Sequence, residues 1–273
     1  MHILRVGSIM ATNPNPRGAL EFANQVERLY AALACSALSD FRPALPNSSA
    51  AHEPSLGGKL LYAGSLDAEA RALLVAANIA GAASLAVSAD AEASKQASRD
   101  GVVDFLVNSL DEALRILKNE IRKRETVAVC VATAPHAAEA DFAHEMLDRG
   151  VSPDLTWPIE AIPPGAGQVL MAWSVASGAA QWLPKLDAIA LHCLDSDLSP
   201  ASATARRWLR LAPRYLGRRS QGVRVLRCDE QTAVRFQQEI REHVERAEIG
   251  VTVDLCQSRN GQTEQSSFAP LAR

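Results

Sequence analysis

Short apolar runs alternate with amphipathic stretches along most of this chain, which is typical of an α/β protein. Apolar runs of strand length cover Lys59–Ala63, Ala82–Val87 and Val127–Val131, and the residues between them have helical spacing. Because strands that alternate with helices form parallel sheets, we predict an α/β, Rossmann-like fold. Its sheet should be mainly parallel, with helices on both faces.

Three helices carry signals at their starts or along one face. Ser109 and Glu112 form a capping box, which predicts a helix from Ser109 to about residue 124. Ser199 precedes a proline in the arrangement of an N-cap and first helical residue, so a further helix should run to about residue 216. An apolar stripe over residues 17–40 predicts an N-terminal helical arm.

The first predicted strand ends in a turn that has the layout of a dinucleotide-binding βαβ unit. Asp67 is placed to N-cap the helix that follows, and Asp90 ends the second strand about twenty residues beyond the turn. In such units the turn holds the pyrophosphate and the acid binds the ribose. The candidate cofactor-binding residues are therefore Gly64, Ser65, Leu66, Asp67, Arg71 and Asp90.

Short motifs follow one another in a fixed order around this unit. They are Gly58-Lys59, Leu66, Ala76-Ala77, Ala80-Gly81-Ala82, Ser84-Leu85, Val103-Asp104, Leu110-Asp111-Glu112-Ala113-Leu114, Ala137-Ala138-Glu139 and Arg149-Gly150-Val151-Ser152-Pro153-Asp154. In order and spacing they resemble the central Rossmann-like NAD-binding domain of urocanase, the urocanate hydratase of histidine breakdown. The resemblance covers about Gly58 to Asp154 and implies NAD as the cofactor and a homodimer as the assembly.

The resemblance implies that several glycines occupy this turn in the urocanase family and that their backbone amides bind the pyrophosphate of NAD. The matching positions here are Ser65, Asp67, Ala68, Ala70 and Arg71, so each of those glycines is replaced. A Cβ restricts φ and blocks the close approach of a phosphate. The Asp67 carboxylate would also repel a phosphate about 4 Å away by about 4 kcal/mol, against roughly 0.3–1 kcal/mol of attraction from the helix dipole.

The altered turn argues against NAD unless a cation neutralises Asp67. Arg71, one helical turn further on, could do so, or it could form an ordinary helix-surface pair with Asp67. Two functions follow from these alternatives. The chain is either a non-catalytic or altered-ligand relative of the urocanase NAD-binding domain, or a urocanate hydratase-like lyase with a rebuilt cofactor site. The Arg-Asp-His catalytic segment of urocanase finds no counterpart, so the catalytic residues stay unknown and enzymatic activity stays open.

We expect four segments along the chain. They are an N-terminal helical segment and loop (1–56), the Rossmann-like core (57–156), a C-terminal α/β extension of the same or an adjoining sheet (157–256) and a mobile tail (257–273). Strands in the extension are predicted at residues 168–175, 187–194, 223–228 and 250–255.

The composition of the chain limits the kinds of partner that we expect it to bind. The net charge of −3 and pI near 6.1 give no electrostatic footprint for nucleic acid, and the arginines of residues 206–219 are predicted to form a helix face. The five cysteines lack paired spacing, which predicts reduced thiols and no metal site. No segment reads as a signal peptide or membrane span. We expect a cytoplasmic protein whose partners are a small molecule or nucleotide and a second copy of itself.

Overall fold

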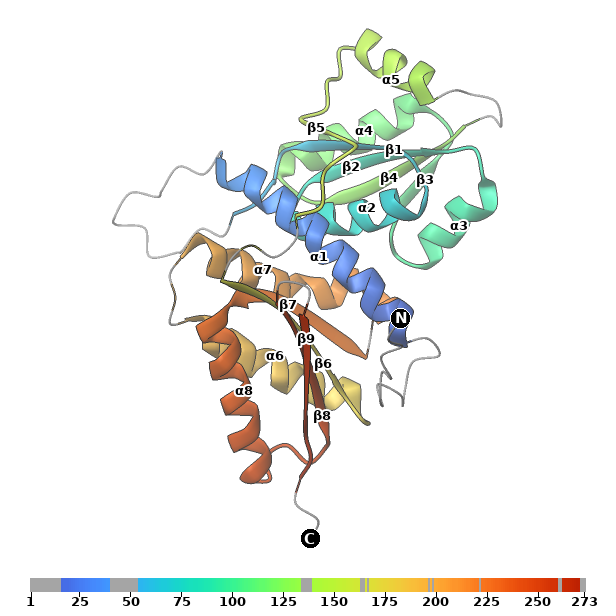
Figure 1. The fold of residues 1–273 in the computed structure, drawn as a ribbon. Helices are drawn as coiled ribbons and strands as arrows, with labels where there is room; N and C mark the ends of the chain where they lie inside the picture. Colours follow the sequence, from blue (N-terminus) through green and yellow to red (C-terminus); the bar gives the residue numbers. More distant parts are fainter. Residues whose placement is uncertain are drawn as a thin grey trace. The chain divides into compact units, whose positions relative to one another are not determined.

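Figure 1 shows the computed structural model of the chain. It describes residues 16–39, 54–133, 139–162, 165, 167–195, 197, 199–220, 222–259 and 262–270. Most of the loop predicted before residue 57 lies outside these ranges. The predicted helical arm is confirmed as α1 (Pro16–Ser39). The chain divides into two compact units, residues 25–162 and residues 163–273 together with those up to 24.

The unit of residues 25–162 is built on a parallel sheet. Its strands are β1 (Leu60–Ser65), β2 (Ala83–Ser88), β3 (Phe105–Val107), β4 (Val127–Ala132) and β5 (Leu155–Thr156). Among the described residues they pair in the order β3-β4-β2-β1-β5, each parallel to its neighbours. This confirms the predicted Rossmann-like α/β fold with a parallel sheet.

Helices cover this sheet on both faces, and its central strands β2 and β4 are buried on both faces. The helices are α2 (Ala68–Ala80), α3 (Ala91–Arg99), α4 (Leu110–Lys123) and α5 (Glu139–Asp148). Tyr62, Leu85 and Val129 share one core cluster with residues of α4 and α5. Alternate strand residues point the other way, toward α2 and α3 (Figure 1). Strand β2 is buried at every position.

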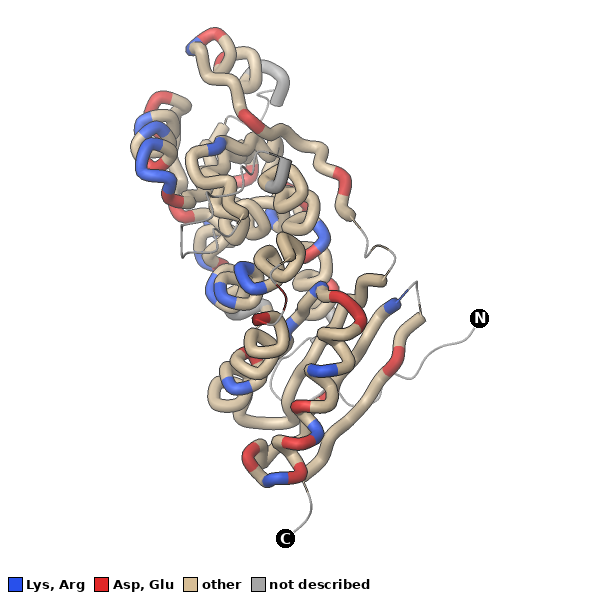
Figure 2. The backbone as a smooth tube through the Cα atoms, turned by 90° about the vertical axis from the view of Figure 1, so that its left-hand side faces the viewer, with Lys and Arg blue, Asp and Glu red and all other residues tan. Residues whose placement is uncertain are grey.

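Helix α4 follows its sequence signals closely. The Ser109 hydroxyl accepts a hydrogen bond from the Glu112 amide at 3.3 Å, as the predicted capping box requires. The helix ends at Arg124, which has a left-handed φ of 60°. Its outer face carries both charges, with Lys123 Nζ 2.8 Å from Glu120 Oε1. Figure 2 shows blue and red segments interleaved in this way along much of the backbone.

Two aspartates fasten the amino ends of neighbouring strands. Asp154 accepts the Leu60 amide at 2.8 Å and donates its own amide to the Leu60 carbonyl at 2.9 Å. Its other carboxylate oxygen lies 3.3 Å from Lys59 Nζ. Asp104 makes the same two hydrogen bonds with Ala128. Its carboxylate accepts the Ala128 amide at 2.8 Å, and its own amide donates to the Ala128 carbonyl at 2.8 Å. Each carboxylate supplies an acceptor where the sheet ends, so the pairing register is fixed there.

The other unit contains a second sheet. Its strands are β6 (Gln168–Val175), β7 (Val223–Asp229), β8 (Val253–Arg259) and β9 (Gln262–Phe268). They pair antiparallel in the order β7-β6-β8-β9. The helices are α6 (Ala179–Asp195), α7 (Pro200–Tyr215) and α8 (Glu230–Glu245), with a short 3₁₀ turn η1 (Gly217–Ser220). The predicted helix start at Ser199 is confirmed, since its hydroxyl accepts the Ser202 amide at 3.1 Å.

Three predictions for this half of the chain are wrong. Residues 187–194 form part of α6 rather than a strand, because buried residues from Leu183 to Leu194 recur at helical spacing. The sheet is antiparallel rather than mainly parallel, because α6 and α7 follow one another and return the chain to the edge that β6 left. Where a mobile tail was predicted from residue 257, β8 continues to Arg259 and β9 pairs with it. The polar side chains of β9 suit an exposed edge strand.

One face of the second sheet packs on helices around a buried ion pair. Trp173, from β6, lies between Arg224 and Leu255 in the cross-strand register, and its ring centroid is 4.9 Å from that of Phe236 in α8. Arg224 Nε donates to Asp187 Oδ2 of α6 at 2.9 Å, and each of these two side chains is only 13% exposed. Burial raises the pKa of Asp187, outweighing the opposite effect of the Arg224 guanidinium. The pair therefore loses much of its attraction to desolvation.

No helix among the described residues combines the length and the apolar character that a membrane span needs.

Replacing Asp154 tests whether its carboxylate holds β5 against β1. We expect Asp154→Ala to lower the free energy of unfolding by about 1–2 kcal/mol, because the Leu60 amide loses its acceptor. Hydrogen exchange of that amide should accelerate, whereas exchange in the centre of β2 should follow only the global change. Asp154→Asn keeps an acceptor oxygen and should recover part of the loss. Equal exchange rates at Leu60 in both variants would contradict this role.

Replacing Asp187 distinguishes two free energies: the loss of stability when one partner of the buried ion pair is removed, and the net contribution of the intact pair. Asp187→Ala leaves Arg224 buried without a carboxylate and should cost about 3 kcal/mol, measured by urea unfolding. The double variant Asp187→Leu/Arg224→Met should cost less than the single one. The folded pKa of Asp187 is raised, so its stabilising contribution is complete below about pH 4 and is lost as pH rises through the folded value. A double variant less stable than Asp187→Ala would contradict this account.

Candidate functional site

The candidate site is the carboxyl edge of the parallel sheet, where β1 ends. Strand β2 lies on one side of β1 and β5 on the other. The chain runs from β1 through α2 to β2 on the first side, and it reaches β5 on the second side only later, from β4 through α5. In open α/β sheets, ligands bind outside the carboxyl ends of the strands at such a switch point. Gly64, Ser65, Leu66 and Asp67 lie here in sequence, as predicted from the βαβ pattern.

Gly64 serves the strand rather than a phosphate-binding turn. It has a φ of +70°, which a residue with a Cβ rarely adopts, and it is buried. The pairing of β1 with β2 shifts register between Tyr62 and Ser65, on either side of it. Beyond the kink, Leu66 donates its amide to the Val87 carbonyl at 2.8 Å and buries its side chain. Gly64 thus lies where β1 bends against β2.

Asp67 confirms its predicted position as the N-cap of α2. Its Oδ1 accepts the Ala70 amide at 2.8 Å, and its backbone is extended, with φ −89° and ψ −168°. Glu69 follows in the first turn of the helix. Both side chains are exposed at the carboxyl edge. The helix end that would attract a phosphate therefore already holds one carboxylate and has a second beside it.

The Arg71 side chain contacts α3 rather than Asp67. Its Nη2 donates to the Ala93 carbonyl at 2.5 Å, and its Nη1 lies 3.6 Å from Asp100 Oδ2. The Arg71 and Asp100 side chains are 16% and 22% exposed. The guanidinium thus ties α2 to both ends of α3. Neither sequence-based interpretation of Arg71, a phosphate-binding cation or a surface partner of Asp67, matches this placement.

Asp90 lies where the βαβ layout expects the ribose-binding acid, at the carboxyl end of β2. Its Oδ1 accepts the amides of Glu92 and Ala93, at 2.9 and 3.0 Å, and so caps α3. The Ser88 hydroxyl donates to the Asp90 carbonyl at 3.1 Å and accepts the Asp90 amide at 3.2 Å. Asp90 and the β1 turn therefore share one edge, but each carboxylate serves its own helix.

Three residues at this edge were missed from the sequence. Ser88 ends β2, Thr133 follows β4 and donates its amide to the Ser88 carbonyl at 2.9 Å, and Trp157 follows β5 and donates to the Tyr62 carbonyl at 3.0 Å. Each of these residues ends or follows a strand. That position in the sequence could have identified them as residues of the carboxyl edge. The Ala137-Ala138 motif of the urocanase resemblance lies outside the described residues.

In the described part of the chain, Cys130 is not an activated thiol and no metal-binding cluster is found. Burial raises the pKa of Cys130, in β4, to about 11, so its thiol stays protonated near neutral pH. No group of three His, Cys, Asp or Glu side chains there is placed to hold a metal ion.

Comparison with known protein families identifies the parallel-sheet unit. Residues 47–157 match the family model described as the urocanase Rossmann-like domain. The match contains the whole of the sheet from β1 to β5. It confirms the relationship to urocanase that the ordered motifs between Gly58 and Asp154 indicated.

The capping role of Asp67 predicts a distinct response to two replacements. Asp67→Ala should lower the free energy of unfolding by about 1 kcal/mol, because the Ala70 amide loses its acceptor. Asp67→Ser can still cap the helix and should retain most of that stability. Urea unfolding of the full chain measures both. Equal losses in the two variants would show that the cap contributes through its charge rather than its hydrogen bond.

Proposed function

We propose that the Rossmann-like unit is a non-catalytic or altered-ligand relative of the urocanase NAD-binding domain, whose carboxyl edge does not hold NAD. The observation that carries this proposal is the Asp67 carboxylate, which occupies the N-terminus of α2 and accepts the Ala70 amide. That helix end is the place where a Rossmann fold binds the pyrophosphate.

The residues at the turn fit a dinucleotide poorly in both shape and charge. Ala68 and Ala70 each present a Cβ at positions matched to family glycines, and the kink at Gly64 bends β1 rather than opening a phosphate cradle. Repulsion between Asp67 and a phosphate about 4 Å away is worth about 4 kcal/mol, several times the attraction of an exposed helix dipole. Arg71 could offset this only by leaving the Ala93 carbonyl and Asp100.

The edge suits a ligand without phosphates better than NAD. Asp67, Glu69 and Asp90 are exposed carboxylates on the first turns or caps of α2 and α3. Their combined field favours a neutral or cationic group, or a basic surface of a partner protein. The urocanate hydratase-like lyase would instead need a cation brought to the turn and catalytic groups from elsewhere.

A titration with NAD tests the proposal. We expect no heat of binding and no nucleotide released from the purified wild-type chain on denaturation in a mass spectrometer. Asp67→Ser removes the charge but keeps a capping oxygen, so binding of ADP, the portion of NAD that contains adenosine and both phosphates, should tighten at least tenfold. Glu112→Gln is the matched control, since it removes one carboxylate from the first turn of α4.

NAD released at one per wild-type chain would overturn the proposal. It would support the lyase, and hydration of urocanate would then be the first activity to assay. Equal tightening of ADP by Asp67→Ser and Glu112→Gln would show that overall charge, rather than the cap of α2, opposes the phosphate.

A further inference from the structure

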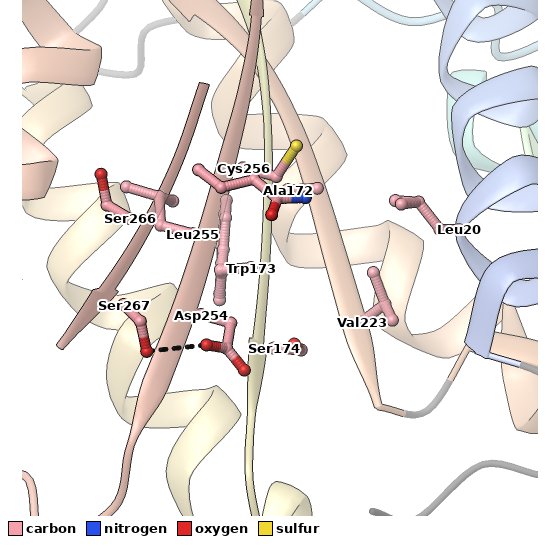
Figure 3. A pocket seen from close by; sticks show the side chains of 11 residues that line it. Leu20, Ala172, Trp173, Ser174, Val223, Asp254, Leu255, Cys256, Ser266 and Ser267 are labelled. Carbon is pink, nitrogen blue, oxygen red and sulfur yellow. Dashed lines mark hydrogen bonds between the residues drawn. The ribbon is translucent and has the colours of Figure 1, made fainter. Parts of the chain in front are cut away.

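The second sheet has a hollow on the face opposite Trp173. Because neighbouring residues of a strand point to opposite faces, Ala172 and Ser174 point away from the helices that Trp173 contacts. The cross-strand register places side chains from all four strands beside them. The residues of this face that line the hollow include Ala172, Ser174, Val223, Asp254, Cys256 and Ser267 (Figure 3). Trp173 and Leu255, which lie between them along β6 and β8, also border it.

Small side chains create this hollow. Its volume is about 320 Å³, near the lower end of the range for small-molecule sites. Alanine, serine and cysteine at the centre of the sheet leave space above the backbone, and Leu20 of α1 and Val223 line one side of it (Figure 3). Ser174 is only 7% exposed and Val223 only 4%, so the β6 and β7 side of the hollow is covered. Ser267, on the edge strand β9, is exposed, so the hollow opens to solvent on that side.

Asp254 places a negative charge within this mostly apolar hollow. Its Oδ1 accepts a hydrogen bond from the Ser267 hydroxyl at 2.8 Å, which orients the carboxylate (Figure 3). In the described part of the chain, no lysine or arginine forms an ion pair with it. A carboxylate partly removed from water is stabilised by a cation that also donates hydrogen bonds.

We propose that the hollow is a binding site for a small cation with a flat apolar body, such as an aryl amidine or aryl amine. The cationic group binds the Asp254 carboxylate, and the apolar body lies over Ala172 between Leu20 and Cys256. The charge of Asp254 selects a cationic ligand, and the small side chains under the hollow limit how thick the ligand can be. The site belongs to the unit of the antiparallel sheet and does not depend on the function proposed for the Rossmann-like unit.

Benzamidine, with neutral benzamide as its isostere, tests the proposal on the full chain. In an NMR titration, benzamidine should saturate and shift the amides of β6, β8 and β9 around Ala172 and Asp254, with at least tenfold tighter binding than benzamide. Asp254→Asn should abolish that preference, and Ala172→Leu should fill the hollow and weaken both ligands. Glu264→Gln is the matched control, because it removes one charge from the opposite face of β9.

Alkylation of Cys256 gives a second readout that needs no variant of the site. Cys35 is exposed and Cys130, Cys193 and Cys228 are buried, so Cys256 is the next thiol to react once Cys35→Ser is introduced. Benzamidine should slow its alkylation and benzamide should not. Equal affinity for the two compounds, no saturable shift in this face, or loss of benzamidine binding in Glu264→Gln as complete as in Asp254→Asn would overturn the proposal.

Discussion

Burial of β2 on both faces is the constraint on which the Rossmann-like unit depends. Every residue of this strand is buried, and burial of a side chain the size of Leu85 or Val87 contributes about 1.5–3 kcal/mol. One helix layer cannot cover two faces, so α2 and α4 must pack on opposite sides of the sheet. Helix α2 is buried along almost all of its length after the first turn, which fixes its position against β1 and β2. The location of its N-terminus, and hence of Asp67, follows from that packing.

Several of the residues that resemble urocanase stabilise backbone conformation or strand pairing. Gly58 and Gly81 both have a φ of +94°, and Gly81 ends α2 in the left-handed conformation that a C-cap requires. Asp104 and Asp154 close the amino ends of strands. Asp67 and Asp90 lie at the other, carboxyl edge of the sheet, where they cap α2 and α3. The chemistry of that edge can vary without disturbing the fold, because sheet construction and ligand binding use opposite ends of the same strands.

Local signals in the sequence were sufficient for much of the parallel unit. Capping at Asp67 and Ser109 depends on residues three positions apart, and the buried strands form short, mainly apolar runs, so both could be predicted. The Arg71 contact with Asp100 joins residues 29 positions apart and depends on how α2 and α3 pack. Short apolar runs such as residues 187–194 fit a buried helix as well as a strand. The hollow beside Asp254 depends on the register of four strands, which no local pattern specifies.

The two sheets can form at different times during synthesis, because their strands follow one another along the chain. The parallel sheet is complete once β5, ending at Thr156, has left the ribosome, before any strand of the second sheet has fully emerged. Strand β6 must then wait for both of its neighbours, β7 and β8, and β9 is added only with residues 262–268. The apolar residues of β6 therefore stay without their strand partners through the synthesis of two helices. The finished Rossmann-like unit precedes them on the nascent chain, so vectorial folding separates the two sheets in time.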